Sequence, residues 1–152
     1  MQCGSTDVIV DAIMDTIITV YPLREKDIRF VRDEVFIVEQ SVSREEEFDD
    51  RDNHCIHAVT YVNGAPVGTG RIDLEKNGKI GRVAVLKAHR RRGIGRMIMH
   101  ALESYAKDKG LTRLWFHAQV QAVPFYSNLG YRISGGEFIE ADIPHVKMEK
   151  GI

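Results

Sequence analysis

The segment 80–118 constrains the fold more than any other part of the chain. It begins with a short, β-branched apolar run at residues 80–86, which predicts a buried strand. Apolar residues then recur at spacings of three and four over residues 94–105, which predicts a helix that Gly110 ends. A second apolar run follows at residues 114–118. Two strands joined through a helix are expected to lie parallel, with a right-handed crossover.

The loop between the first strand and the helix carries glycines and a cluster of positive charge. Gly93 and Gly95 lack a Cβ atom, so backbone N–H groups there can approach a ligand closely. The start of a helix favours an anion, and the arginines of the loop add to this effect. They are Arg90, Arg91, Arg92 and Arg96. We expect a phosphate or pyrophosphate site; the alternatives are a solvated basic turn and a nucleic-acid patch, and the lack of interleaved aromatic residues argues against the patch.

Two motifs resemble those of a known family. The first is Arg90-x-x-Gly93-x-Gly95, directly after a Val-Ala-Val strand, and the nucleotide-binding loops with their own glycine patterns are absent. The second is Phe125-Tyr126-x-x-Leu-Gly-Tyr131. They resemble motifs A and B of the GNAT acetyltransferases, and the likeness in layout extends over residues 16–149.

This resemblance implies a fold and a co-substrate. The GNAT-like fold is a mixed α/β sheet, in which an antiparallel meander precedes a parallel β-α-β unit and the sheet is splayed between strands 83–86 and 114–118. Acetyl-CoA is expected in that wedge, with its pantetheine paired to the β-strand backbone and its pyrophosphate on the N–H groups of residues 91–96. The residues expected to bind it are Val83, Ala84, Val85, Arg90, Arg91, Arg92, Gly93, Ile94, Gly95, Arg96 and Phe125.

The implied activity is transfer of the acetyl group to a primary amine of a small molecule, by direct attack in a ternary complex. A backbone N–H near Val85 is expected to polarise the thioester carbonyl. Tyr126 stands at the motif position whose phenol protonates the leaving thiolate, and a phenol is a donor below a pH of about 10. The alternative for Tyr126 is a core aromatic residue. The alternative for the whole chain is a non-catalytic acyl-CoA-binding sensor or interaction domain.

The general base is less clear from the sequence. Some relatives carry a glutamate on the strand before the phosphate loop, but the matching position here is near Lys79, which cannot serve. The candidates are Glu39, His117 and His145, and a histidine has the intrinsic pKa for the task. A chain of water molecules is an equal alternative.

Two Asn-Gly pairs organise the residues before this unit. Asn-Gly between β-rich runs is a strong hairpin signal, so residues 57–62, 67–74 and 79–86 are expected to form three antiparallel strands. Residues 16–21 predict a further strand and residues 25–40 a helix. The acidic run 41–53 is interpreted as a solvated loop, with an alternative as a surface that attracts a cationic amine.

Length and composition limit the remaining classes. The 152 residues predict an N-terminal extension, residues 1–15, and a single domain, residues 16–152. The net charge of -1 argues against nucleic-acid binding, and no apolar run of about 18 residues predicts a membrane span. Two cysteines suggest a reducing, cytoplasmic setting. No metal site is expected, because the acidic run lacks a calcium-loop spacing; a homodimer stays possible.

Overall fold

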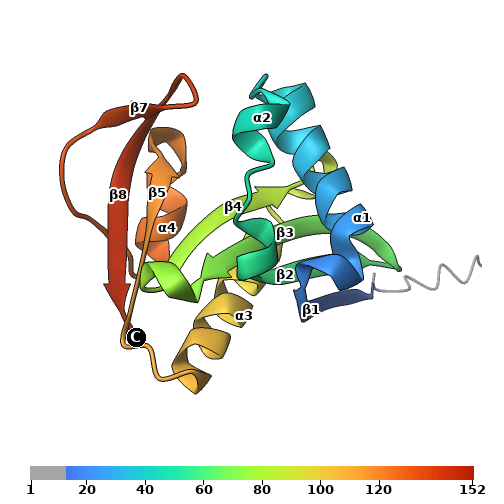
Figure 1. The fold of residues 1–152 in the computed structure, drawn as a ribbon, viewed down its shortest axis with the longest axis horizontal. Coiled ribbons are helices and arrows are strands. Elements are labelled where there is room, and N and C mark those ends of the chain that lie inside the picture. The colour runs from blue at the N-terminus through green and yellow to red at the C-terminus, as the bar shows by residue number, and fades with distance from the viewer. Residues whose placement is uncertain (1–12) are drawn as a thin grey trace, which may run out of the picture.

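The computed structural model of the chain describes residues 13–152. In this part of the chain eight strands form one mixed sheet in the order β1-β2-β3-β4-β5-β8-β6, and β7 pairs with β8 (Figure 1). The N-terminal extension predicted for residues 1–15 lies outside the described residues except for its last three. Of these, Met14 and Asp15 begin strand β1.

The first half of the sheet is the predicted antiparallel meander. Its strands are β1 (Met14–Val20), β2 (Ile56–Val62), β3 (Ala65–Asp73) and β4 (Lys79–Val85). Both Asn-Gly pairs have positive φ at both residues, as their turns require. The three strands predicted after the acidic run are therefore confirmed. A short 3₁₀ turn, Leu74–Lys76, lengthens the second connection.

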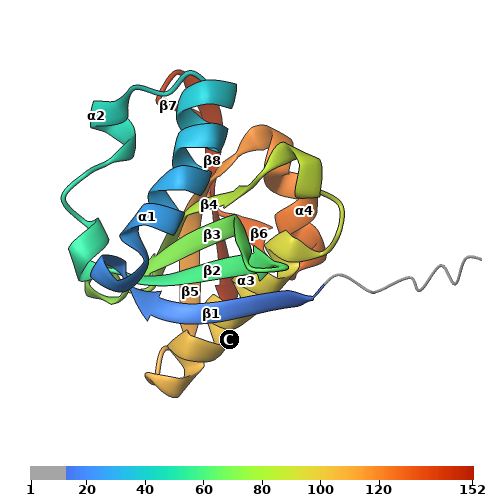
Figure 2. The same ribbon diagram turned by 90° about the vertical axis from the view of Figure 1, so that its right-hand side faces the viewer.

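Two helices cover opposite faces of this meander (Figures 1 and 2). Helix α1 (Tyr21–Arg32) continues into a π-helical segment, Asp33–Glu39; it starts four residues earlier than predicted because Pro22 suits a first helical turn. Helix α3 (Ile94–Asp108) packs on the other face. In β2, Val59 packs against α1 and Ala58 belongs to the cluster under α3. Burial on both faces explains why this strand shows no apolar–polar alternation.

The sheet opens between β4 and β5 (Arg113–Gln119). These strands are parallel, as predicted, but they pair only at Lys79 and Trp115 and diverge beyond that point (Figure 1). Strand β5 instead pairs along its length with β8 (Ile143–Gly151). The splay predicted between residues 83–86 and 114–118 is confirmed, and it leaves the edge of β4 without a strand partner.

The second half of the sheet carries its polar residues on one face. Leu114, Phe116 and Ala118 of β5 are buried in the core, so the alternate residues of β5 face the other way. The remaining elements are α4 (Val123–Asn128), β6 (Arg132–Ile133) and β7 (Phe138–Glu140), with the short helix α2 (Arg44–Glu47) following α1.

Candidate active site

A cavity of about 1000 Å³ fills the opening between β4 and β5. Strand β4 and the start of α3 form one wall, β5, β7 and β8 form another, and α4 contacts both. The π-helical segment and the loop around α2 close a third side. The cavity therefore joins the glycine-containing loop to the three base candidates, since Glu39, His117 and His145 all line it.

The start of α3 directs unpaired backbone N–H groups toward the cavity. Gly93 caps the helix with φ +81°, and the first helical bond runs from Met97 N to the Gly93 carbonyl. The N–H groups before Met97 have no helical partner. The Ile94 side chain is buried in the core, so only its backbone can meet a ligand there. Arg91 and Arg96 line the same end, whereas Arg92 does not.

Gly95 is needed for packing against an aromatic ring. A Cβ atom at Gly95 would lie 2.9 Å from Cζ of Phe125, which is closer than side chains pack. The sequence predicts that a ligand approaches the backbone closely at this glycine. In the structure the space is taken by Phe125, which itself lines the cavity.

Arg90 is occupied by protein groups. Its guanidinium donates to both carboxylate oxygens of Glu39, at 2.6 Å each, and to the Val85 carbonyl at 2.9 Å. The hydrogen bonds and charge of Arg90 lower the pKa of Glu39. These contacts join the π-helical segment to the glycine loop, and they favour a structural role for both residues over phosphate binding or base catalysis.

Tyr126 presents a protonated phenol to the cavity. It lies on α4, and its ring packs on Phe116 with 4.4 Å between centroids. Burial raises the pKa of its hydroxyl, and no hydrogen bond or charge contributes to that shift. The hydroxyl is therefore a donor at neutral pH that can serve a group inside the cavity.

Two histidines and a glutamate of β5, β8 and β7 also line the cavity. His117 Nδ1 lies 2.9 Å from Glu140 Oε1, and His145 Nδ1 lies 2.6 Å from the Ile143 carbonyl oxygen. Glu140 was missed from the sequence because it lies in a three-residue strand far from any motif. The sequence does carry a signal for the two histidines. Polar and apolar residues alternate along β5 and β8, which places His117 and His145 on one face of the sheet.

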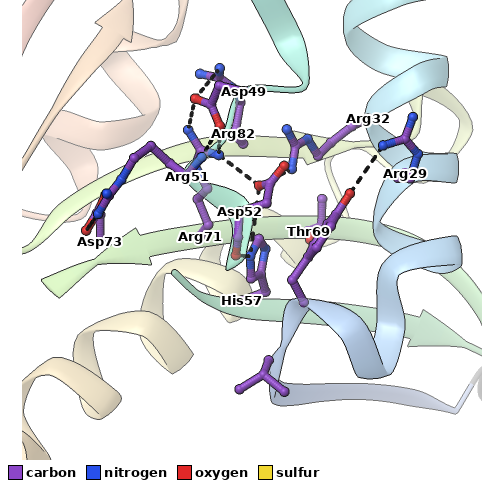
Figure 3. A network of polar contacts seen from close by, with 12 residues as sticks. Arg29, Arg32, Asp49, Arg51, Asp52, His57, Thr69, Arg71, Asp73 and Arg82 are labelled. Atoms are coloured by element: carbon purple, nitrogen blue, oxygen red, sulfur yellow. Dashed lines mark hydrogen bonds and ion pairs between the residues drawn. The ribbon is translucent and has the colours of Figure 1, made fainter. Parts of the chain in front are cut away.

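The acidic run forms an internal ion network with arginines from α1, β3 and β4 (Figure 3). Arg32 is fully buried and donates to Glu47 Oε2, to the Glu47 carbonyl and to Asp52 Oδ1. Arg71 bridges Asp52 and Asp49. The prediction of a solvated loop is wrong for these three acidic residues, because three arginines distant in sequence, Arg32, Arg71 and Arg82, neutralise them. Arg82 pairs with Glu47, and Arg51, which belongs to the run itself, pairs with Asp73 on β3.

The pKa values of the acidic residues reflect this pairing. Burial acts to raise the pKa of Asp49, but its hydrogen bonds to Arg71 and the charge of that arginine outweigh burial and hold the pKa well below the usual range. The same balance, with Arg32 and Arg71 as partners, lowers the pKa of Asp52. Burial dominates at Glu47 and raises its pKa. The network contributes little net negative charge to the cavity.

No helix in the span 13–152 is both long and apolar enough to cross a membrane. Over that span, no group of three or more His, Cys, Asp or Glu side chains is arranged to hold a metal ion. Cys55 is buried, and burial raises the pKa of its thiol to about 11.

The splayed sheet with its cavity beside a glycine-containing helix start defines the chain as an acyltransferase. Residues 22–152 match the model of the acetyltransferase (GNAT) domain, and the chain belongs to this family. An uncharacterized N-acetyltransferase of Bacillus subtilis, YjcF, is 48% identical over 127 residues, which cover 82% of this chain and 91% of YjcF. The uncharacterized protein YyaT of the same organism is 45% identical over 80% of this chain and 85% of its own length.

Solved structures share the same fold. A Lactobacillus plantarum protein assigned to the N-acetyltransferases is 32% identical, with a TM-score of 0.83 over 91% of this chain and 97% of that one. An acyl-CoA N-acyltransferase from Pseudomonas aeruginosa is 26% identical, with a TM-score of 0.79 over 91% and 99%. A Bacillus anthracis structure in complex with acetyl coenzyme A shares the fold at 18% identity, with a TM-score of 0.57 over 65% and 63% of the two chains.

Proposed function

We propose that this acyltransferase moves the acetyl group of acetyl-CoA to a primary amine of a small molecule. One observation carries the proposal. The unpaired edge of β4, the open N–H groups at the start of α3 and the phenol of Tyr126 all border one cavity. An extended thioester with a diphosphate at one end and a leaving sulfur at the other needs these three features together.

The edge of β4 fits a pantetheine arm. Leu86 donates its N–H to the Val67 carbonyl on β3. Because backbone groups alternate along a strand, Val85 directs its own into the cavity, which Val83 also lines beside a bulge at Arg82. The Val85 carbonyl is taken by Arg90, which leaves the Val85 N–H for the ligand. The Val85 N–H would polarise the thioester carbonyl.

The start of α3 fits the diphosphate. The N–H groups of residues 94–96 have no helical partner, the helix dipole favours an anion there, and Arg91 and Arg96 add positive charge. Arg90 is engaged elsewhere, so we assign the phosphate contacts to the backbone and to these two arginines. The Bacillus anthracis neighbour with bound acetyl coenzyme A supports a ligand of this class.

The chemistry follows from these positions. The amine nitrogen forms a bond to the acetyl carbonyl carbon, and the carbon–sulfur bond breaks. Tyr126 gives its hydroxyl proton to the departing sulfur, which yields CoA as the thiol, and regains a proton from solvent. Holding both reactants in one cavity supplies much of the rate, because attack becomes effectively unimolecular.

The proposal is tested by binding and turnover in one preparation. Calorimetric titration is expected to show binding of acetyl-CoA and CoA, and no binding of ATP or NAD at the same concentrations. Release of free thiol is then measured with acetyl-CoA and a panel of small primary amines, with a lysine-containing peptide for comparison. No binding by the folded protein would contradict the proposal. Binding without thiol release for any amine would favour an acyl-CoA-binding sensor.

A further inference from the structure

The wall of the cavity formed by β5, β7 and β8 carries a carboxylate between two imidazoles. His117 on β5 and His145 on β8 lie on the same face, because Gln119, two residues after His117, is the register partner of His145. Strand β7 adds Glu140 to that face, and its Phe138 pairs with His145. The polar group is therefore built by three strands that meet only in the folded sheet.

Glu140 fixes the orientation and the protonated nitrogen of His117. An ionised carboxylate only accepts hydrogen bonds, so the 2.9 Å contact places the proton of neutral His117 on Nδ1. Its Nε2 then carries a lone pair. Phe138 and Trp115 meet the imidazole edge-on, at centroid distances of 4.8 and 5.6 Å, and hold the ring in place. The His117 side chain keeps 27% of its surface exposed, so a substrate can reach it.

His145 is held differently although it lies beside the same carboxylate. Its Nδ1–H donates to the Ile143 carbonyl, and its ring stacks on Phe138. Its Nε2 is 3.8 Å from Glu140 Oε2, beyond hydrogen-bond distance, and only 8% of its side chain is exposed. This histidine supports the wall of the cavity and offers little access to an acceptor.

Glu140 has no arginine or lysine partner within ion-pair distance in residues 13–152; its two close partners there are the histidines. Two lysines lie near the group. Lys147 is the register partner of His117, and the charge of Lys79 on β4 interacts with that of Glu140. The carboxylate is thus available to an imidazole that takes up a proton. This arrangement differs from Glu39, whose two oxygens are both bound by Arg90.

We propose that Glu140 is a positioning residue that presents Nε2 of His117 to the acceptor amine, and that His117 is the general base of acetyl transfer. The inference rests on the proposed function. As the nitrogen–carbon bond forms, the amine proton passes to His117 Nε2, and the resulting imidazolium is stabilised by Glu140 until it releases the proton to solvent. Tyr126 donates a proton to the leaving sulfur and His117 accepts one from the amine, so both proton transfers of the reaction have a named donor and acceptor.

The pairing itself can be tested without turnover. Nitrogen-15 spectra of the histidine rings report which nitrogen carries the proton. We expect neutral His117 to be protonated on Nδ1 in the wild-type protein and to shift toward the Nε2–H form in Glu140→Met. Glu140→Gln keeps an acceptor oxygen, so it should retain most of the wild-type signal. Glu137→Met makes the same change at an exposed position of the same segment and should leave the His117 signals unchanged.

Kinetics with an amine found in the turnover screen then test the role. His117→Ala is expected to lower kcat about 100-fold, and Glu140→Met roughly tenfold through misplacement of the ring, with Glu140→Gln in between. The KM for acetyl-CoA should not change. A wild-type His117 tautomer in Glu140→Met, or full turnover in His117→Ala, would overturn this inference. Absence of thiol release by the wild-type protein would instead contradict the proposed function.

Discussion

The two ends of the cavity are built in different ways. The end that we propose for the coenzyme comes mainly from one continuous segment, which runs from β4 to the start of α3. Helix α4, which follows later in the sequence, completes it. The end assigned to the acceptor combines β5, β7 and β8 with the loop around α2, which is distant in sequence. A local motif can therefore identify the first end, whereas the second is assembled only by the pairing of strands in the sheet.

Arginines show the same contrast. Those of the glycine loop are largely exposed, and Arg91 and Arg96 have no ion-pair partner in the described part of the chain. Arg32, Arg51 and Arg71 are held by carboxylates within the fold. Arg91 and Arg96 are therefore available to an anionic ligand, whereas Arg32, Arg51 and Arg71 fix the loop around α2. We thus propose a binding role for positive charge at one end, whereas at the other end it is paired within the fold.

The largest effect is expected from removing the buried arginine. Arg32→Met leaves Glu47 and Asp52 buried without their main partner, and loss of one member of such a group costs about 3–5 kcal/mol. The free energy of unfolding in urea measures this loss. Arg44→Met is the matched control, since Arg44 is exposed and its pair with Asp33 should contribute less than about 1 kcal/mol. Equal stability of the two variants would show that the network does not hold the acceptor end.

The next effect concerns the coenzyme end. Tyr126→Phe removes the phenol but keeps the ring packed on Phe116, so acetyl-CoA affinity should be unchanged. Loss of a general acid is expected to lower kcat about 100-fold. Thiol release under saturating acetyl-CoA measures the effect, and calorimetry checks the binding. Tyr131→Phe is the control, because that hydroxyl donates to Glu103. Full turnover in Tyr126→Phe would remove Tyr126 from the mechanism.

The sequence predicted the fold closely because its signals are local. Asn-Gly turns, β-branched runs and the helix after Gly93 each depend on neighbouring residues, and all were found in the structure. The acceptor end was predicted poorly. The acidic run looked solvated because its partners Arg32, Arg71 and Arg82 are distant in sequence. Each lies 15 to 35 residues along the chain from the residue of the run that it binds, either Glu47 or Asp52. Glu140 meets His117 only through the pairing of β7 with β8 and of β8 with β5.

Acid should weaken the acceptor end through its aspartates. The pKa values of Asp49 and Asp52 are lower in the folded state than in the unfolded chain, so their contribution is present above a pH of about 4 and is lost as the pH falls through the folded values. The raised pKa of Glu47 acts in the opposite direction and offsets part of the loss. Urea unfolding between pH 5 and 2.5 should show a decrease on the order of 2 kcal/mol. Asp49→Asn should flatten this dependence, and an identical slope would contradict the pairing.

The smallest effect tests whether Gly95 serves packing or direct ligand approach. Gly95→Ala places a Cβ atom 2.9 Å from Phe125 Cζ, so the ring must shift within the coenzyme end of the cavity. We expect acetyl-CoA affinity to fall about tenfold, which is about 1.4 kcal/mol, with little change in stability because Phe125 is partly exposed.

A second substitution separates the two explanations. If the ring is the obstacle, Gly95→Ala combined with Phe125→Leu should bind acetyl-CoA more tightly than Gly95→Ala alone, since leucine leaves room for the added methyl group. If the ligand itself needs the glycine, the double variant should bind no better than the single one. Calorimetric titration of both variants, with Phe125→Leu alone as the reference, distinguishes these outcomes. Recovery would mean that the second glycine of the loop is retained for contact with α4, so that even the end of the cavity marked by a local motif depends in part on a residue 30 positions further along the chain.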